Sequence, residues 1–466
     1  MSKLTSMNFI LHRHTAVVAI ALVAGMGPGT SIASGVVASA PACHVGAYQL
    51  ADGEIIDINA SSTPGVVRWH RIDGRTGTLE RSEDGLWRGR AGWTTRDDPL
   101  AVQFGSCGAG RIIFGERAGQ MMPLDVTDLM FTGNGVNLRG RLVMPAGTAA
   151  VPVVVLVHGS EAYSGVDYYH AQHLFPASGI GVFVYDKRGT GGSSGKYTQD
   201  FGVLASDAVA ALTVARRLGG VRVARIGLHG SSQGGWVAPL AATLTPVDFV
   251  LVAYGLAESP GAEDREQVLQ ELVAAGYGAE VLLAARQVTE ATGRVMATRS
   301  SAAFADLREV RRKYGSEPWW PVMQGEFTGS LLRYPSWLSR LALPFFDKGT
   351  PWAHDPMPVL RAVTAPQLWI IAAQDTDAPP AETLRRLKLL ASEGKSITTA
   401  VFPDTEHGLV EFETAANGTR TRTRYADGYL KMSMDFVRDG KVKVDDYGRA
   451  KVPSLAPAES LAPTGY

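Results

Sequence analysis

A glycine-flanked serine in the middle of the chain constrains its fold more than any other feature. The residues G-S-S-Q-G at 230–234 fit the spacing G-x-S-x-G, which places a serine on a sharp turn between a strand and a helix, with its hydroxyl exposed above a sheet. The spacing selects Ser232, because Ser231 has no glycine two residues before or after it. An apolar segment at 226–228 and a small-residue helical segment at 236–244 supply the strand and helix that such a turn requires. We therefore predict that Ser232 is a nucleophile at the end of a strand.

A serine nucleophile needs a histidine to accept its proton and a carboxylate to orient that histidine. Where a serine lies on a turn of this kind, the acid and then the histidine follow it in the chain. Only His354 and His407 follow Ser232, and His354 precedes the last strand-like segments. His407 lies in a loop directly after the strand-like segment 398–402. We therefore predict that His407 is the general base.

The acid is expected in the turn that follows the strand-like segment 367–371. This turn contains Asp375 and Asp377, and either could instead cap the helix that begins after Pro380. Asp375 is closer to the end of the strand, so we prefer it, with Asp377 as the alternative.

The oxyanion of an acyl-transfer intermediate needs two backbone donors. One comes from the residue after the nucleophile and the other from the loop after an earlier parallel strand. These rules indicate the amides of Gln233 and Ser160, with Glu161 as an alternative to Ser160. His158 precedes the nucleophile, and we expect its imidazole to bond to nearby backbone rather than to act as the base.

Strands and helices alternate from residue 126 to about 450, which is typical of a doubly wound, mostly parallel α/β sheet. The apolar run 153–158 fits a strand buried on both faces. The alternation stops at about 257 and resumes at about 357, an excursion too long for an ordinary crossover. We interpret it as an inserted helical cap.

Residues 43–125 contain short apolar patches separated by turn signals such as Asp73-Gly74 and Asp84-Gly85. Closely spaced hairpin signals with few helical runs predict a small antiparallel β module. Cys43 and Cys107, the only two cysteines, bracket this segment, so we expect them to form a disulfide in an oxidising compartment. The alternative, in which Cys43 carries a lipid, would exclude that disulfide.

The two ends of the chain differ in composition from its body. Residues 1–42 have basic residues, an apolar run at 15–26 and then small residues, the order of a secretory signal peptide. We therefore expect a periplasmic or secreted protein without stable membrane insertion of the mature chain, with an uncleaved anchor as the alternative. The last segment, 451–466, is rich in Pro, Ala and Ser and is predicted to be disordered.

Charge and motifs exclude several classes of ligand. The chain of 466 residues has 45 basic and 45 acidic residues without a long run of either sign, so nucleic acid is not an expected partner. The glycine-rich run 189–195 fits neither the phosphate-binding nor the dinucleotide-binding spacing. His170 and His173 lie three residues apart, but no carboxylate or cysteine pattern accompanies them. We expect no cofactor and no metal.

Five motifs occur in the order found in serine hydrolases of the α/β-hydrolase fold. They are His158-Gly-Ser160, Y-D-K-R-G-T-G-G-S at 185–193, the serine turn at 230–234, the Asp375 turn and His407-Gly408. From 126 to about 440 the chain resembles bacterial esterases and the dienelactone-hydrolase or prolyl-oligopeptidase-like proteins. The chain departs from this pattern at Ala372, where the family commonly has a glycine three residues before its acid.

The resemblance implies an acyl hydrolase with a helical cap that cleaves carboxylic esters of small molecules. One alternative is a serine peptidase of the prolyl-oligopeptidase-like type, although the β module is far too short to be a propeller. A second is a non-catalytic binding protein on a hydrolase scaffold, against which the full set of nucleophile, acid and base argues. The oligomeric state is not predicted.

Overall fold

The computed structural model of the protein describes residues 42–452. Residues 1–41 of the predicted signal peptide and residues 453–466 of the predicted tail lie outside the described residues. The described chain divides into two compact units, one formed by 259–347 and the other by 42–258 together with 348–452. No helix among the described residues is long and apolar enough to cross a membrane.

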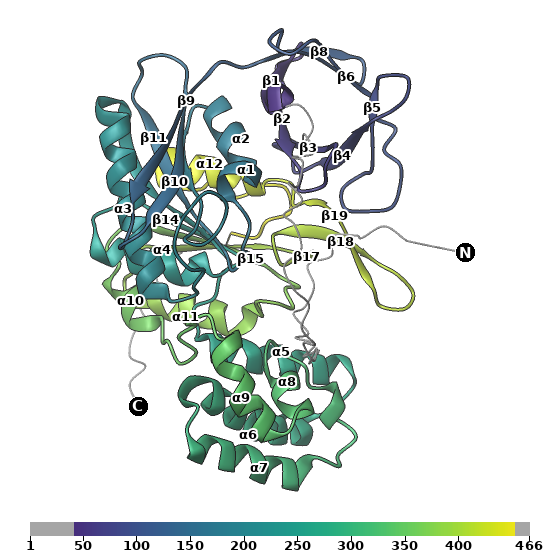
Figure 1. Cartoon of the computed structure of the whole chain (residues 1–466), viewed down its shortest axis with the longest axis vertical. Helices are drawn as coiled ribbons and strands as arrows, with labels where there is room; N and C mark the ends of the chain where they lie inside the picture. Colours follow the sequence, from purple (N-terminus) through teal and green to yellow (C-terminus); the bar gives the residue numbers. More distant parts are fainter. Residues whose placement is uncertain (1–41, 453–466) are drawn as a thin grey trace, which may run out of the picture. The chain divides into compact units, whose positions relative to one another are not determined.

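The predicted β module is a closed barrel of eight antiparallel strands, seen as a ring of strands in Figure 1. Its first strand pairs with both the second and the last, which closes the ring. Buried side chains of the strands, Tyr48 and Trp69 among them, fill its interior. The strands are β1 (Gly46–Leu50), β2 (Ile55–Ala60), β3 (Val66–Arg71), β4 (Thr76–Arg81), β5 (Trp87–Arg88), β6 (Val102–Phe104), β7 (Arg111–Phe114) and β8 (Arg117–Met121).

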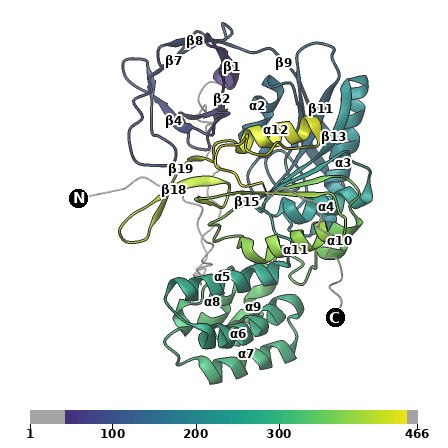
Figure 2. The same cartoon turned by 180° about the vertical axis from the view of Figure 1, so that it is seen from behind.

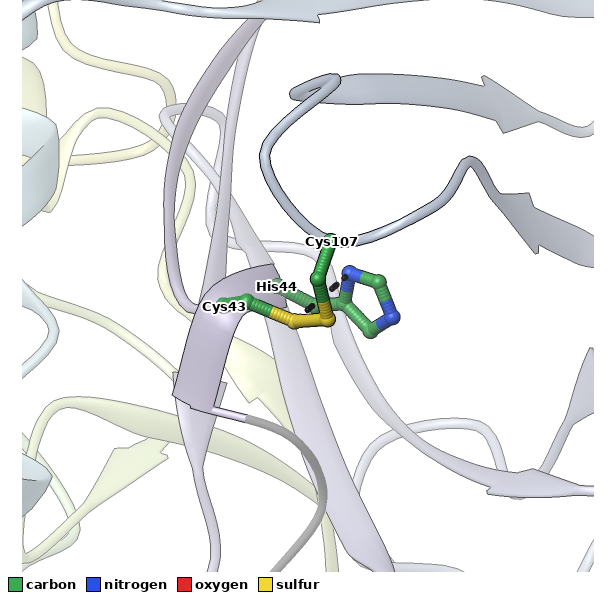
Figure 3. A group of neighbouring side chains, drawn as sticks. All are labelled: Cys43, His44 and Cys107. Atoms are coloured by element: carbon green, nitrogen blue, oxygen red, sulfur yellow. Dashed lines mark hydrogen bonds between the residues drawn. A yellow bond between two sulfur atoms is a disulfide. The ribbon is translucent and has the colours of Figure 1, made fainter.

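A disulfide joins Cys43 to Cys107, with the two Cα atoms 5.5 Å apart. Cys43 lies in the short 3-10 helix Ala42–His44, and Cys107 lies between β6 and β7. Figure 3 shows the imidazole of His44 beside the disulfide. The predicted pairing is therefore present, and a cysteine bonded in this way has no thiol left to carry a lipid.

The second body of this unit is an eight-stranded sheet in the order β16-β15-β14-β13-β11-β12-β10-β9. The hairpin β9–β10 and its pairing with β12 are antiparallel, and the pairs from β12 to β16 are parallel. The strands are β9 (Leu124–Thr132), β10 (Asn137–Pro145), β11 (Val151–Val157), β12 (Gly181–Tyr185), β13 (Val223–Ser231), β14 (Val250–Ala253), β15 (Gln367–Ala372) and β16 (Ile397–Phe402). This is the predicted mostly parallel sheet.

Helices cover both faces of the sheet, because successive side chains of a strand point to opposite faces. Val153 and Val155 of β11 belong to a core with α3, α4, α10 and α11, whereas Val154 and Leu156 belong to a core with α1, α2 and α12. Figures 1 and 2 show the sheet between these two sets of helices. The helices are α1 (Gly165–Tyr168), α2 (Ala171–Ala177), α3 (Phe201–Gly219), α4 (Gly234–Leu244), α10 (Met357–Ala362), α11 (Pro380–Ser392) and α12 (Tyr429–Asp439), with a 3-10 turn at Gly220–Arg222.

The structure differs from the sequence pattern at two places. The pattern of residues 168–178 predicts one helix, but Tyr168 is the last residue of α1, the backbone is extended at Tyr169, and α2 begins only at Ala171. The Tyr168 carbonyl accepts a hydrogen bond from Asn59 of the barrel at 2.6 Å, so a contact outside the segment stabilises the break. A three-stranded sheet that was not predicted, β17 (Thr405–Glu406), β18 (Val410–Thr414) and β19 (Arg420–Tyr425), follows β16.

The unit formed by 259–347 is entirely helical in its regular structure, as expected for a cap. Its helices pack around a core that includes Val268, Leu272, Val288 and Trp319. The buried carboxylate of Asp264 accepts hydrogen bonds from the amides of Phe327 and Thr328. The elements are α5 (Pro260–Ala274), α6 (Ala279–Thr298), α7 (Ser301–Tyr314), a 3-10 turn (Trp320–Val322), α8 (Thr328–Arg333) and α9 (Ser336–Phe346).

A buried polar cluster joins the barrel to the α/β body within their common unit. Asp57 of β2 is fully buried and accepts hydrogen bonds from Nδ1 of His70 at 2.8 Å and Nδ1 of His173 at 2.6 Å. His70 lies on β3, whereas His173 lies on α2. The ring of His170 stacks on that of His70, with centroids 4.2 Å apart. The two histidines considered in the sequence as metal ligands therefore contribute to this contact.

Candidate active site

The serine turn has the strained geometry that its sequence predicted. Ser232 follows β13 directly and has φ +52°, a value uncommon for any residue except glycine. A Cβ on Gly230 would lie 2.1 Å from the carbonyl oxygen of Gly234. The glycines are therefore needed because the backbone crosses itself closely as the strand turns into α4.

The structure brings Ser232, His407 and Asp375 together. His407 Nε2 lies 3.0 Å from Ser232 Oγ, and His407 Nδ1 lies 2.9 Å from Asp375 Oδ2. The three residues follow β13, β15 and β16 at the carboxyl edge of the sheet, where open α/β sheets place their sites. In this geometry the neutral imidazole can donate to the carboxylate and accept the proton of the serine.

Asp375, not Asp377, is the carboxylate that contacts the imidazole. Asp375 is 2 % exposed, and its other oxygen, Oδ1, accepts hydrogen bonds from the amides of Asp377 at 2.9 Å and Ala378 at 2.7 Å. The backbone of the turn therefore fixes the carboxylate that faces His407.

The contact with Asp375 changes the pKa of His407. Burial alone would lower the pKa of His407, but the charge of Asp375 and its hydrogen bond outweigh burial and raise the pKa above its usual value. Tyr254, which directly follows β14, packs edge-on against the imidazole with ring centroids 5.0 Å apart. Tyr254 was not predicted as a site residue, although its place after a parallel strand at the same sheet edge is a usable signal.

The loop after β11 lies beside the nucleophile. A Cβ on Gly159 would lie 3.3 Å from Ser232 Cβ, so the residues predicted to supply an oxyanion donor run past the serine. Gln233, the other predicted donor, lies between Ser232 and the first residue of α4. The positive end of the dipole of α4 therefore faces the same space.

Two side chains bind the carbonyl oxygens of this loop. Lys187 Nζ donates to Gly159 O at 2.7 Å, and the hydroxyl of Tyr197 donates to Ser160 O. Burial lowers the pKa of Lys187 to about 8, while the charge of Glu161 opposes that shift. In the sequence, Lys187 stands out only as part of the motif at 185–193, and no signal there connects it with the loop.

His158 is buried, and among the described residues its Nε2 has no hydrogen-bond partner. Its ring packs edge-on against that of Tyr185, with centroids 4.7 Å apart, and it forms a hydrogen bond with the backbone of Tyr185. Burial lowers the pKa of His158 to about 4, so the ring is neutral at physiological pH. It bonds to nearby backbone, as expected from the sequence.

One group of residues could in principle hold a metal ion. Among the described residues, Cys43, His44 and Cys107 have ligand atoms that lie within 4.8 Å of one another. The two sulfur atoms are bonded to each other, whereas a metal needs deprotonated thiolates. The group fits a metal only after reduction of the disulfide.

Comparison with known families identifies the α/β body. A model of the alpha/beta hydrolase family matches residues 154–417. The chain belongs to the alpha/beta hydrolase family. The matched residues of this alpha/beta hydrolase include Ser232, Asp375 and His407, and the barrel of β1 to β8 lies outside them.

Individual relatives cover this alpha/beta hydrolase only in part. It is 34% identical over 109 residues to a protein called thiohydrolase aneE from Aspergillus aculeatus, a match that covers 23% of this chain and 34% of that protein. The chain therefore spans about a third of the length of the curated relative that it matches.

Two examples illustrate the similarity of this chain to solved structures. The acylaminoacyl peptidase of Pyrococcus horikoshii has a TM-score of 0.44 and 15% identity, with coverage of 85% of this chain and 58% of the peptidase. Brefeldin A esterase, described as a bacterial homologue of human hormone sensitive lipase, has a TM-score of 0.39 and 16% identity, with coverage of 62% and 70%.

Proposed function

We propose that this protein is a serine hydrolase that cleaves carboxylic esters of small molecules through an acyl-enzyme. The observation that carries the proposal is the continuous chain of hydrogen-bond contacts from Ser232 Oγ through His407 to the buried Asp375. A serine with φ +52° at the end of β13 and a histidine with a raised pKa support the same assignment.

In the proposed mechanism, Ser232 Oγ attacks the ester carbonyl carbon while His407 Nε2 accepts the hydroxyl proton. Asp375 holds the imidazole through Nδ1 and stabilises its charged form. The amides of Gln233 and Ser160 bind the oxygen that becomes negative. His407 returns the proton to the leaving alcohol, and the acyl group remains on Ser232. A water molecule, deprotonated by His407, then releases the carboxylic acid and restores the serine.

The test is hydrolysis of p-nitrophenyl esters from acetate to long acyl chains, with acyl thioesters added because one relative is called a thiohydrolase. We expect Ser232→Ala to lower kcat by at least about ten-thousand-fold while the fold is retained. Asp375→Asn should lose about as much, because the imidazole is then held in the wrong tautomer. Asp377→Asn is the matched control and should keep most of the activity.

Two outcomes would contradict this mechanism. Turnover that survives in Ser232→Ala would show that another group attacks the ester. If the wild-type protein cleaves no ester and no thioester, the alternatives are a peptidase or a binding protein, and peptides would be tested next.

We also propose that the mature protein works in the periplasm or outside the cell, without stable insertion into a membrane. The disulfide between Cys43 and Cys107 supports this location, because such bonds persist mainly in oxidising compartments. Cell fractionation with a carboxyl-terminal tag would test it, and recovery of the full-length chain in the cytoplasm would contradict it.

A further inference from the structure

The side chain of Glu161 lies beside the nucleophile and has no part in the mechanism above. A Cβ on Gly159 would lie 2.6 Å from Glu161 Oε2 and 3.3 Å from Ser232 Cβ. The carboxylate oxygen therefore lies within about 6 Å of Ser232 Cβ. A substrate group attached to the acyl carbon on Ser232 is within reach of a carboxylate at this distance.

The two oxygens of this carboxylate differ in their hydrogen bonds. Glu161 Oε1 accepts a hydrogen bond from the hydroxyl of Tyr169. Within residues 42–258 and 348–452, no side chain forms a hydrogen bond or an ion pair with Oε2. The ammonium of Lys187 interacts electrostatically with Glu161, but its hydrogen bond goes to Gly159 O. Lys187 therefore interacts with the charge of Glu161 without a hydrogen bond to Oε2.

The negative charge of Glu161 opposes the proposed reaction for a neutral substrate, while the ammonium of Lys187 acts against this effect. The carbonyl oxygen of an ester becomes negative when the serine attacks, and two like charges a few ångströms apart repel each other strongly in a partly buried site. A positive charge on the substrate, placed between the two, would be attracted by the carboxylate and would offset that repulsion.

The aromatic residues near Glu161 suit a cation as well. The charge of Glu161 raises the pKa of Tyr163 and of Tyr254, in addition to the larger effect of burial. The ring of Tyr163 is half exposed and lies edge-on to that of Tyr169, with centroids 6.3 Å apart. Aromatic faces attract ammonium groups, and they do so more strongly where water is excluded.

We propose that Glu161 is a specificity-determining residue that binds an ammonium group on the acyl part of the substrate. Oε2 would accept a charge-assisted hydrogen bond of about 2.8 Å from that ammonium group. The preferred substrates are then esters of amino acids rather than of plain fatty acids. This inference rests on the proposed ester hydrolysis.

The experiment compares two isosteric esters in the full-length mature protein. One is norvaline methyl ester, and the other is its analogue in which a methyl group replaces the ammonium. Acid release is followed by titration at a pH at which the amino ester is charged. An ammonium also activates an ester chemically, so the preference of one protein alone is not enough. The preference is the kcat/KM for the amino ester divided by the kcat/KM for its methyl analogue. The measured quantity is this preference in the wild type divided by the preference in Glu161→Gln. We expect this quotient to be at least about tenfold.

A matched control is Glu80→Gln, which removes an exposed carboxylate from β4 of the barrel and should leave the ratio as in the wild type. A quotient near one for Glu161→Gln would overturn the inference, while hydrolysis of both esters would leave the proposed esterase function intact. If Glu161→Gln does not fold, the inference is tested by the salt dependence of the wild-type protein alone. Its preference for the amino ester should fall as salt screens the carboxylate, and a preference independent of salt would overturn the inference.

Discussion

The peptide group between Gly159 and Ser160 illustrates how single residues shape the candidate site. A peptide is planar and trans, so its carbonyl oxygen and its N–H point in opposite directions. Lys187 holds the oxygen of this peptide at 2.7 Å, and the N–H on its other side belongs to Ser160, the predicted oxyanion donor. We therefore expect Lys187 to act on the proposed reaction as a positioning residue, through the direction of that N–H.

We expect Lys187→Met to lower kcat by about tenfold to a hundredfold, with a smaller change in KM. The loose peptide would no longer point its N–H at the oxygen that becomes negative, whereas binding of the neutral ester would change little. Steady-state kinetics on a p-nitrophenyl ester measures both constants. Lys196→Met, which removes an exposed lysine nearby in the sequence, should leave them unchanged. A loss confined to KM would refute the positioning role.

The residues that sequence analysis identified are those whose roles depend on local geometry or chain order. The turn at Ser232 needs glycines at fixed offsets, because the backbone crosses itself there. His407 follows from the order of acid and base along the chain. Lys187 and Tyr197 could not be found in this way, because they act on a loop that precedes them by 28 and 37 residues.

At the scale of elements, the strands and helices around the sheet were predictable from apolar runs and turn signals. The hairpin β18–β19 was missed, although Asn417-Gly418 between alternating side chains is a strong hairpin signal. The break between α1 and α2 is stabilised by the hydrogen bond from Asn59 of the barrel to the Tyr168 carbonyl. No pattern within the segment encodes that partner.

The contact between β2, β3 and α2 depends on the carboxylate of Asp57. Burial alone would raise its pKa, but the charges and hydrogen bonds of His173 and His70 hold the pKa of Asp57 below its usual value. A carboxylate that accepts two hydrogen bonds in a buried site is costly to remove, because both donors are left without a partner.

We expect Asp57→Ala to lower the free energy of unfolding by about 3 kcal/mol or more. Urea unfolding monitored by tryptophan fluorescence measures the change, and limited proteolysis should show earlier cleavage between the barrel and β9. Asp97→Ala, in which an exposed carboxylate of the barrel loses its ion pair with Arg90, is the control and should change stability by less than about 1 kcal/mol. Equal effects of the two substitutions would contradict the role of Asp57.

At the scale of the whole molecule, the formal charge is zero, but stability still depends on pH through every group whose pKa differs between the folded and the unfolded chain. His158 and His229 are almost fully buried, and burial lowers the pKa of each to about 4. Among the described residues, neither ring nitrogen of His229 has a hydrogen-bond partner. In the helical unit the effect is opposite, because burial raises the pKa of Asp264 to about 6.

The sign of the histidine effect follows from proton binding. An unfolded histidine has a pKa of about 6.5, so between that value and about 4 the unfolded chain binds a proton that the folded chain excludes. The stability contributed by neutral His229 is complete above the unfolded pKa and is lost as the pH falls towards the folded value. Asp264 changes stability with pH in the opposite direction, between its usual pKa and about 6. The contribution of one group is therefore isolated only by comparing the wild type with a variant that lacks that group.

We therefore predict that His229→Met makes the free energy of unfolding less dependent on pH. Each excluded proton is worth about 1.4 kcal/mol per pH unit, so the wild type should lose about 2 kcal/mol more than the variant between about pH 6.5 and pH 5. Urea unfolding at the two pH values gives both numbers. The comparison uses the change in the free energy of unfolding between the two pH values. A loss of stability that is the same at both pH values therefore does not affect it. Parallel pH profiles would show that the folded protein accommodates a charged His229, contrary to its burial without polar partners.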